Sequence, residues 1–214
     1  MRAAEPVGDD FDARRSATAR RYRYLVWNSS VPEPLLARLA WHVAEPLDVK
    51  AMAAAADALL GEHDFRAFCR RPSGLLASEP IVRFVTAAAW RRVDVTGVLG
   101  DQESPGGGRR GERGASGASG FDPVLLRFDV AARSFCHQMV RSIVAVLVDA
   151  GRGRANAATV MEMLAAGSRA GLPQPAPPHG LCLDGVDYGR GSPWSGSTAR
   201  RGAAVEGDEA CATR

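Results

Sequence analysis

The sequence predicts an α+β fold, with a mostly antiparallel sheet flanked by helices. Strand-like alternation or β-branched content recurs in four segments, and a helical apolar stripe recurs in three. Two of the strand segments are separated by residues 98–120, which are rich in Gly, Ser and Arg and have no apolar periodicity. Such a segment is typical of an insertion at a hairpin tip, so the flanking strands are expected to run antiparallel.

The chain begins with a short acidic segment, residues 1–12, followed by a basic stretch over 13–23. The first strand is predicted over 21–27, where aromatic and apolar residues alternate with arginines. Period-two alternation places two sets of side chains on opposite faces of it: Tyr22, Tyr24 and Val26 on one, and Arg21, Arg23, Leu25 and Trp27 on the other.

Three helices are predicted from apolar residues at helical spacing. The first spans 48–60, with Asp48 as its N-cap and Gly61 as its stop. The second spans 135–150 and is apolar on two sides, so it is expected to lie deep in the protein. The third spans 156–166 and ends before Gly167.

The remaining segments complete the order of elements. Residues 63–68 and 70–74 are interpreted as loop. Strands are predicted over 81–95 and 124–130, and a last strand over 180–188 follows a Pro-rich connector. We expect the folded domain to span residues 13–188 and residues 189–214 to form a disordered tail.

Composition narrows the class of protein. With 46% hydrophobic and 24% charged residues, the chain is neither a disordered nor a collagen-like sequence, and no stretch reaches the roughly 18 apolar residues of a membrane span. The start lacks the apolar run of a signal peptide, and the four cysteines form no metal-binding spacing. These features favour a cytoplasmic protein with reduced thiols and without a metal site.

Arginine dominates the basic residues. All but one of the 27 basic residues are arginine, the exception being Lys50, and codon bias in a GC-rich genome accounts for most of this. The local cluster around the first strand is more informative, because arginines contact phosphates and a tyrosine can stack on an unpaired base. RNA contact and a solvated basic edge strand both remain open as interpretations of this cluster.

Arg141 is the most unusual residue of the predicted second helix. A cation on an apolar helix needs a carboxylate or phosphate partner, because an unpaired buried charge is costly. Either a structural ion pair or a cation that orients an active-site carboxylate satisfies this need. A thiol mechanism through Cys136 and His137 is disfavoured, because adjacent helical residues point about 100° apart.

Four groups of residues carry motifs between positions 9 and 188. They are Asp10–Arg14 with Ser16–Tyr24, Glu45–Asp48 with Leu59–Phe65 and Phe68, Ser134–Val144, and Gly180–Leu183 with Val186–Tyr188. In this order they resemble the C-terminal two-thirds of the tRNA pseudouridine synthase A (TruA) family. The run ending at Tyr24 and the His-x-Met-Val-Arg run ending at Arg141 are the most specific parts.

The resemblance implies an enzyme that isomerises uridine to pseudouridine at positions 38 to 40 of the tRNA anticodon stem-loop. It implies a pseudouridine synthase-like fold, a homodimer, and no metal or organic cofactor. In the family, an aspartate in an Arg-Thr-Asp-Ala-Gly motif starts rearrangement of the glycosidic bond after the base has been flipped out of its stack.

The resemblance also assigns site residues. Tyr22 would stack on the target base and assist deprotonation at its C5, and Arg141 would pair with the catalytic aspartate. Arg14 would contact the RNA backbone near the target. The basic strand adds three candidate RNA contacts, Arg20, Arg21 and Arg23.

The Arg-Thr-Asp-Ala-Gly motif is the main departure from the family pattern. In the family it lies upstream of the segment matched by Asp10 and Phe11, and here only nine residues precede Asp10. We therefore expect a truncated chain whose fold is incomplete at the N-terminus and which is inactive as it stands. The alternatives are a non-catalytic RNA-binding remnant and one half of a split enzyme.

Overall fold

The centre of the molecule is a six-stranded sheet. The computed structural model describes residues 6–70, 74, 76, 79–94 and 121–189. Its strands follow the order β2-β1-β5-β4-β3, and β6 pairs with β1. Only the β1–β2 pairing is parallel among the described strands, which confirms a mostly antiparallel sheet. The strands are β1 (Ala19–Asn28), β2 (Trp41–Val43), β3 (Gly61–Asp64), β4 (Val82–Val93), β5 (Val124–Ala132) and β6 (Leu181–Asp187).

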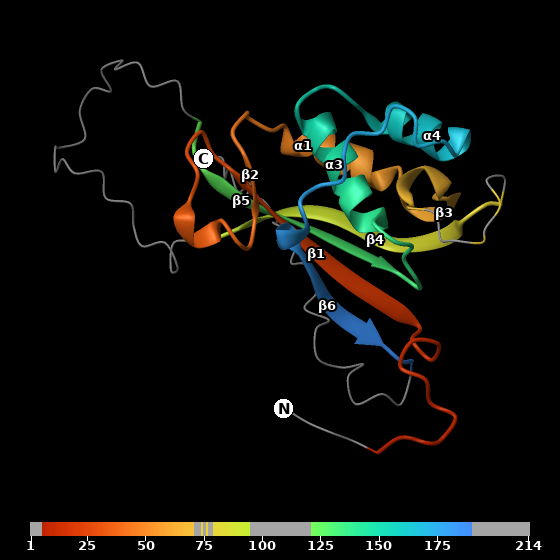
Figure 1. Cartoon of the computed structure of the whole chain (residues 1–214). Helices are drawn as coiled ribbons and strands as arrows, with labels where there is room; N and C mark the ends of the chain where they lie inside the picture. The colour runs from red at the N-terminus through yellow and green to blue at the C-terminus, as the bar shows by residue number, and fades with distance from the viewer. Residues whose placement is uncertain (1–5, 71–73, 75, 77–78, 95–120, 190–214) are drawn as a thin grey trace, which may run out of the picture.

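One face of this sheet carries the helices α1 (Val49–Asp57), α3 (Met139–Gly151) and α4 (Ala157–Ala166) (Figure 1). The main core lies between the two layers, and the central strands supply its largest side chains. Tyr24 and Phe128 are fully buried there, and Trp90 packs against Phe128 at 5.0 Å between ring centroids. The opposite face, called here the open face, has a smaller apolar cluster of four buried residues: Trp27, Leu36, Ala40 and Leu125. The expected α+β class is thus confirmed.

The helix ends follow from local side-chain chemistry. Asp48 caps α1 as predicted, since its side chain accepts hydrogen bonds from the backbone N–H groups of residues 50 and 51. The helix ends at Asp57, earlier than predicted, and Gly61 instead begins β3 with a positive φ of 95°. At α4, Asn156 and Thr159 form a capping box and Gly167 adopts the left-handed conformation, as expected for a C-terminal stop.

Two short strands were not predicted. Residues 61–64 form β3 at the sheet edge, paired with β4, so the interpretation of residues 63–68 as loop was wrong there. The run Gly-Glu-His-Asp has no apolar alternation, so it gives no strand signal. It can still form a strand, because an edge strand with a solvent-facing side can be polar. Strand β2 has only three residues, too few for a periodic signal.

The start of α3 also differs from the prediction. The helix begins at Met139 rather than Phe135, because Gln138 adopts a left-handed backbone with φ of 66°. A non-glycine residue with this φ interrupts a right-handed helix. His137 therefore lies outside the helix, and Arg141 occupies its first turn instead of the deep position that the sequence suggested.

The prediction of reduced thiols is wrong for one pair. Cys69 and Cys136 form a disulfide with Cα atoms 5.7 Å apart, a separation within the usual range for disulfides. These residues are 67 positions apart in sequence, and no spacing rule connects them. Cys182 is free and exposed.

Several predictions concern parts of the chain outside the described residues. These include the insertion at 98–120 and nearly all of the tail at 189–214. The domain boundaries at residues 13 and 188 stay predictions. No helix among the described residues is long and apolar enough to cross a membrane.

Asn28 joins the end of β1 to the segment that leaves β2, residues 43–47, through three hydrogen bonds. The side chain is 2% exposed, donates to the carbonyls of Val43 and Glu45 at 3.0 and 2.7 Å, and accepts from the N–H of Leu47 at 3.3 Å. We expect Asn28→Ala to lower the free energy of unfolding by about 2–3 kcal/mol, because three hydrogen bonds of a buried residue would be lost and the carbonyl of Val43 would keep only the N–H of Ser29 as a donor. Urea denaturation measures this, with the exposed Ser30→Ala as control at less than about 0.5 kcal/mol. Equal costs for the two variants would contradict the assignment.

Glu45 links the segment after β2 to the end of α3. Its carboxylate accepts from Arg152 at 3.0 Å, and this hydrogen bond, followed by a backbone hydrogen bond and the charges of Arg152 and Arg154, lowers the pKa of Glu45. A lowered folded-state pKa stabilises the protein above the unfolded pKa, and this contribution is lost as the pH falls through the folded pKa.

We therefore expect Glu45→Gln to destabilise at neutral pH by less than about 1 kcal/mol, because the side chain is 51% exposed. Thermal unfolding at pH 7 and in the acid range below the unfolded pKa measures the difference. It should vanish at the acid end, and a difference that grows with acidity would contradict this account.

Candidate functional site

Two adjoining cavities, of about 400 and 710 Å³, lie near the start of β1 and next to the start of α3. They share Arg14, Tyr22 and Phe135. The smaller cavity is further lined by the residues that lead into α3 and by Leu181 at the start of β6. The larger adds mainly charged groups: Asp12, Arg15, Arg20, Arg83 and the polar Ser134. Half of the residues that line the larger cavity are therefore arginines, whereas the smaller cavity has two arginines, Arg14 and Arg141.

Tyr22 reaches these cavities because of the alternation along β1. Tyr22, Tyr24 and Val26 share one face of the strand, as predicted, and this is the face that the helices cover. Tyr24 and Val26 are fully buried there, whereas Tyr22, nearer the start of the strand, is only partly buried. Its ring contacts Phe135 edge to face, with centroids 5.1 Å apart and planes at 85°. This contact fixes the ring while leaving the side chain half-buried at the cavity wall.

Residues 135–138, called here the 135–138 turn, form the opposite wall. Phe135 packs on Tyr22, and Cys136 is bonded to Cys69. The carbonyl of His137 accepts from the N–H of Arg70 at 2.8 Å. Gln138 has the single positive φ among the described non-glycine residues. A strained backbone persists only where its surroundings hold it, and here contacts to two other segments do so.

Arg141 projects from the first turn of α3 and is half-buried. Its Nε donates to the carbonyl of Ala176, and the N–H of Ala176 donates back to the carbonyl of Arg141 at 3.0 Å. The neighbouring carbonyl of Pro177 accepts from the hydroxyl of Tyr24 at 2.7 Å. Burial raises the pKa of Tyr24, although the charge of Arg141 opposes this, so the phenol stays a proton donor. The Pro-rich connector thereby holds the guanidinium in place.

The expected carboxylate partner of Arg141 is not among the described residues, where no acidic oxygen lies within ion-pair distance of its guanidinium. Contrary to expectation, Arg141 is also not deeply buried, because the helix begins four residues later than predicted and Arg141 lies in its first turn. Half exposure lets water solvate the charge, which removes the need for an internal ion pair. Arg141 thus presents a cation to the smaller cavity.

Arg14 lies in a short turn before β1, and Arg20, near the start of β1, holds that turn. The carboxylate of Asp12 accepts from the N–H groups of Arg14 and Arg15 at 2.9 and 2.7 Å. Arg20 donates to the carbonyls of Arg14 and Arg133, which ties this turn to the end of β5. Arg14 is therefore an exposed cation on a held backbone, whereas Arg20 already serves two backbone carbonyls.

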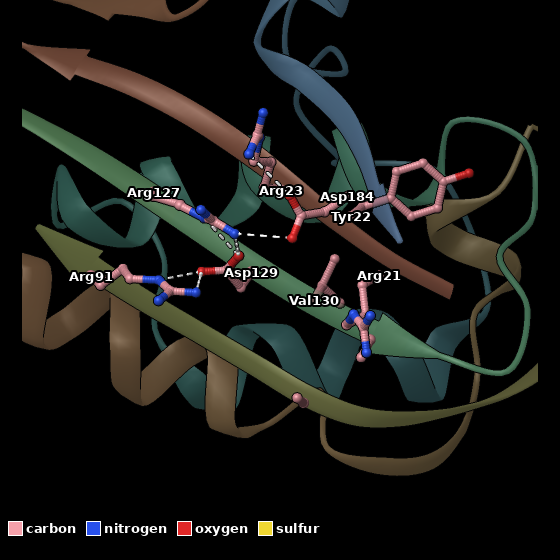
Figure 2. A pocket seen from close by; sticks show the side chains of 10 residues that line it. Arg21, Tyr22, Arg23, Arg91, Arg127, Asp129, Val130 and Asp184 are labelled. Atoms are coloured by element: carbon pink, nitrogen blue, oxygen red, sulfur yellow. Dashed lines mark hydrogen bonds and ion pairs between the residues drawn. The ribbon is translucent and has the colours of Figure 1, made fainter. Parts of the chain in front are cut away.

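Arg21 and Arg23 lie on the open face, away from this cavity. Arg21 pairs with Asp187 at 2.9 Å. Figure 2 shows the open face with a chain of ion pairs across four strands, and the ring of Tyr22 extends to one side of that chain. The chain is Arg91–Asp129–Arg127–Asp184–Arg23, with the last two contacts at 3.2 and 3.0 Å. The basic cluster of the sequence is thus divided between two faces, and the RNA contacts of Arg21 and Arg23 stay predictions.

The structure therefore brings together Tyr22, Arg141, Arg14 and Arg20 around the two adjoining cavities. Arg21 and Arg23 instead line a third cavity, of about 400 Å³, on the open face, and Tyr22 also contributes to its wall. Sequence reasoning did not identify Phe135 or Arg83 as site residues. Phe135 was missed because it was assigned to the apolar face of the predicted helix. Arg83 was missed because nothing in the sequence distinguishes it from other arginines in strands, although it lines the larger cavity. In the described part of the chain, no group of three or more His, Cys, Asp or Glu side chains could hold a metal ion.

Comparison with known proteins connects this site to a family. A family model for tRNA pseudouridine synthase matches residues 55–189. The chain is 37% identical over 185 residues to tRNA pseudouridine synthase A of Moorella thermoacetica, which covers 86% of this chain and 62% of the relative. It is 40% identical over 186 residues to the enzyme of the same name from Methylobacterium nodulans, which covers 87% and 61%.

A third relative, tRNA pseudouridine synthase A of Rhizorhabdus wittichii, is 40% identical over 179 residues, covering 84% of this chain and 58% of the relative. The chain spans about three fifths of the length of these curated relatives. On this sequence identity and the family match, the chain belongs to the tRNA pseudouridine synthase A family.

Proposed function

We propose that this chain forms part of the active site of a TruA-type tRNA pseudouridine synthase, which isomerises uridines 38 to 40 in the tRNA anticodon stem-loop. One observation carries the proposal: Tyr22, Arg14 and Arg141 line a single cavity of about 400 Å³ in a member of this family. That volume lies within the range of small-molecule sites and accommodates one nucleobase.

In this proposal the target uridine is flipped out of the anticodon stem-loop, and its base enters the smaller cavity. The ring of Tyr22 stacks on the base while Phe135 holds that ring edge-on. The larger, more cationic cavity accepts the phosphates on either side, through Arg14, Arg15 and Arg83. Arg20, Arg21 and Arg23 contribute further RNA contacts, the last two only where phosphate displaces their carboxylate partners.

The chemistry needs a carboxylate next to Arg141. The guanidinium and the N-terminus of α3 both favour negative charge there. We propose that an aspartate of the Arg-Thr-Asp-Ala-Gly type occupies this place, supplied from outside the 214-residue chain, and that the chain alone is inactive. The C1′–N1 bond breaks, a C1′–C5 bond forms and the C5 proton is replaced by one on N1, with Tyr22 assisting proton removal. This isomerisation balances without an oxidant or a cofactor.

We further propose tRNA as the partner, the cytoplasm as the compartment and a homodimer as the assembly. The absence of a carboxylate near Arg141 among the described residues also supports two alternatives. One is a non-catalytic RNA-binding protein, and the other is one half of a split enzyme whose second chain brings the aspartate. Binding and turnover experiments separate the three.

Turnover should depend on a supplied aspartate. We expect no pseudouridine from the chain alone on tRNA transcripts, and pseudouridine at positions 38 to 40 from a chimera that carries the preceding residues of the Moorella thermoacetica relative. In the chimera, Tyr22→Phe should bind tRNA normally but turn over more slowly, because it keeps the ring and loses the hydroxyl. Tyr22→Ala should also weaken binding by about 1–3 kcal/mol through lost stacking.

Site-resolved mapping of pseudouridine measures these outcomes, and exchange of the supplied aspartate for asparagine is the control. Turnover by the chain alone would contradict the proposed inactivity. A folded chimera that binds tRNA without turnover would favour the non-catalytic alternative. Restoration by a separate polypeptide would identify a split enzyme.

Phosphate contact by Arg14 should appear in the salt dependence of binding. We expect Arg14→Gln to weaken tRNA binding and to reduce the slope of log affinity against log salt by about one, because one phosphate contact is lost. Arg38→Gln is the matched control, since Arg38 is also exposed but lies outside both cavities. Binding isotherms between low and moderate salt measure both. Equal slopes for the two variants would remove Arg14 from the interface.

A further inference from the structure

The disulfide between Cys69 and Cys136 lies in the wall of the candidate site, and its two sulfur-bearing residues differ in accessibility. Cys136 is partly exposed and lines the smaller cavity together with Tyr22 and Arg141. Cys69 is 1% exposed, at the end of a short 3-10 helix, η2 (Arg66–Phe68), and belongs to the main core. A dissolved thiol or disulfide can therefore reach Cys136 through the cavity but cannot reach Cys69.

The two segments stay close even without the covalent bond. The N–H of Arg70 donates to the carbonyl of His137 at 2.8 Å, one residue beyond each cysteine. Phe135 is fixed against Tyr22 on the other side of Cys136. Reduction would consequently leave two thiols facing each other at the 5.7 Å Cα separation, ready to close again.

We propose that Cys136 and Cys69 form a reversible thiol–disulfide site in the wall of the smaller cavity. In this site, buried Cys69 displaces any thiol that has formed a mixed disulfide with the partly exposed Cys136. The thiol chemistry follows from the disulfide and from the different exposure of its two cysteines. Its effect on tRNA binding rests on the proposed function.

The reaction uses a low-molecular-weight disulfide, RS–SR, as oxidant. The Cys136 thiolate attacks one sulfur of RS–SR, forms a Cys136–S–SR mixed disulfide and releases one RS⁻. The Cys69 thiolate then attacks the Cys136 sulfur, forms the internal disulfide and releases the second RS⁻. Overall, two protein thiols lose two protons and two electrons, and one RS–SR becomes two RSH. Cationic Arg14 and Arg141 line the same cavity and favour the attacking thiolate.

The two products differ in what they add to the cavity. A mixed disulfide places a bulky group beside Tyr22 and Arg141, where the flipped base would lie. The internal disulfide adds no atoms and preserves the 135–138 turn as the structure has it. Cys69 therefore protects the site, because it converts an obstructing adduct into a harmless bond.

The test uses the full chain with Cys182→Ser and Cys211→Ser, so that the pair supplies the only thiols. The reduced protein is treated with oxidised glutathione, and intact mass and tRNA binding are measured. We expect the pair to lose two hydrogens, carry no glutathione and keep binding. With Cys69→Ser, one glutathione should accumulate on Cys136 and tRNA binding should be lost until a reductant is added. With Cys136→Ser, buried Cys69 should gain no glutathione.

Each outcome decides the proposal. Free thiols or a stable glutathione adduct in the paired protein, or an adduct on Cys69 in Cys136→Ser, would overturn the thiol–disulfide site. Unchanged binding by the glutathionylated Cys69→Ser protein would overturn the obstruction. If the reduced paired protein binds no tRNA at all, the proposed function fails, while the mass measurements still decide the thiol chemistry. Cys69→Ala replaces Cys69→Ser if thermal unfolding shows that the serine variant does not fold.

Discussion

The alternation of side chains along β1 determines which of its residues enter the core and which reach the candidate site. This strand is paired with β5 along its length and with β6 and β2 on its other side, so its register is fixed on both edges. A shift by one residue would move Tyr24 out of the core and bring Arg23 into it. The same register sends Tyr22 to the helix-covered face and Arg21 to the open face, which separates the aromatic site residue from part of the basic cluster.

Around this strand, the site is assembled from segments that fix one another. The 135–138 turn is held by an aromatic contact, a disulfide and a backbone hydrogen bond. Arg141 follows this turn in the first turn of α3, and its Nε donates a hydrogen bond to the carbonyl of Ala176. The hydroxyl of Tyr24 donates to the next carbonyl, that of Pro177. Core packing thus positions the cavity wall, because Tyr24 is both a fully buried core residue and a support for the connector that holds Arg141.

Periodicity predicted most of the fold. The strand at β1, the strands β4 and β5, the N-cap Asp48 and the helix stop at Gly167 all follow local rules that the sequence displays. Asn156 was predicted as the first residue of its helix and proved to be the N-cap. Strands β2 and β3 could not be predicted, since three or four polar or mixed residues become a strand only when a neighbour pairs with them. The start of α3 was missed because the left-handed backbone of Gln138 is imposed by tertiary contacts.

The candidate site was predictable in its residue types rather than in its geometry. A basic strand with a tyrosine pointed to RNA, and Arg141 pointed to a negatively charged partner. The alternation already implied that Arg21 and Tyr22 lie on opposite faces, but proximity in sequence grouped them as one cluster. Three contacts in the site join residues that are far apart in sequence, and no local pattern could reveal them. They are the disulfide Cys69–Cys136, the ring contact Tyr22–Phe135 and the hydrogen bond from Arg141 to Ala176.

On the proposed function, the target uridine binds against Tyr22 on the helix-covered side of the sheet. Photo-crosslinking tests it most directly, with the 214-residue chain and a tRNA anticodon stem-loop that carries 5-bromouridine at position 39. This measurement does not require turnover, and mass spectrometry of the digested complex locates the crosslinked peptide. We expect crosslinks to peptides that contain Tyr22 or Phe135. Crosslinks confined to the open face, such as those in β4 around Arg91, would contradict it.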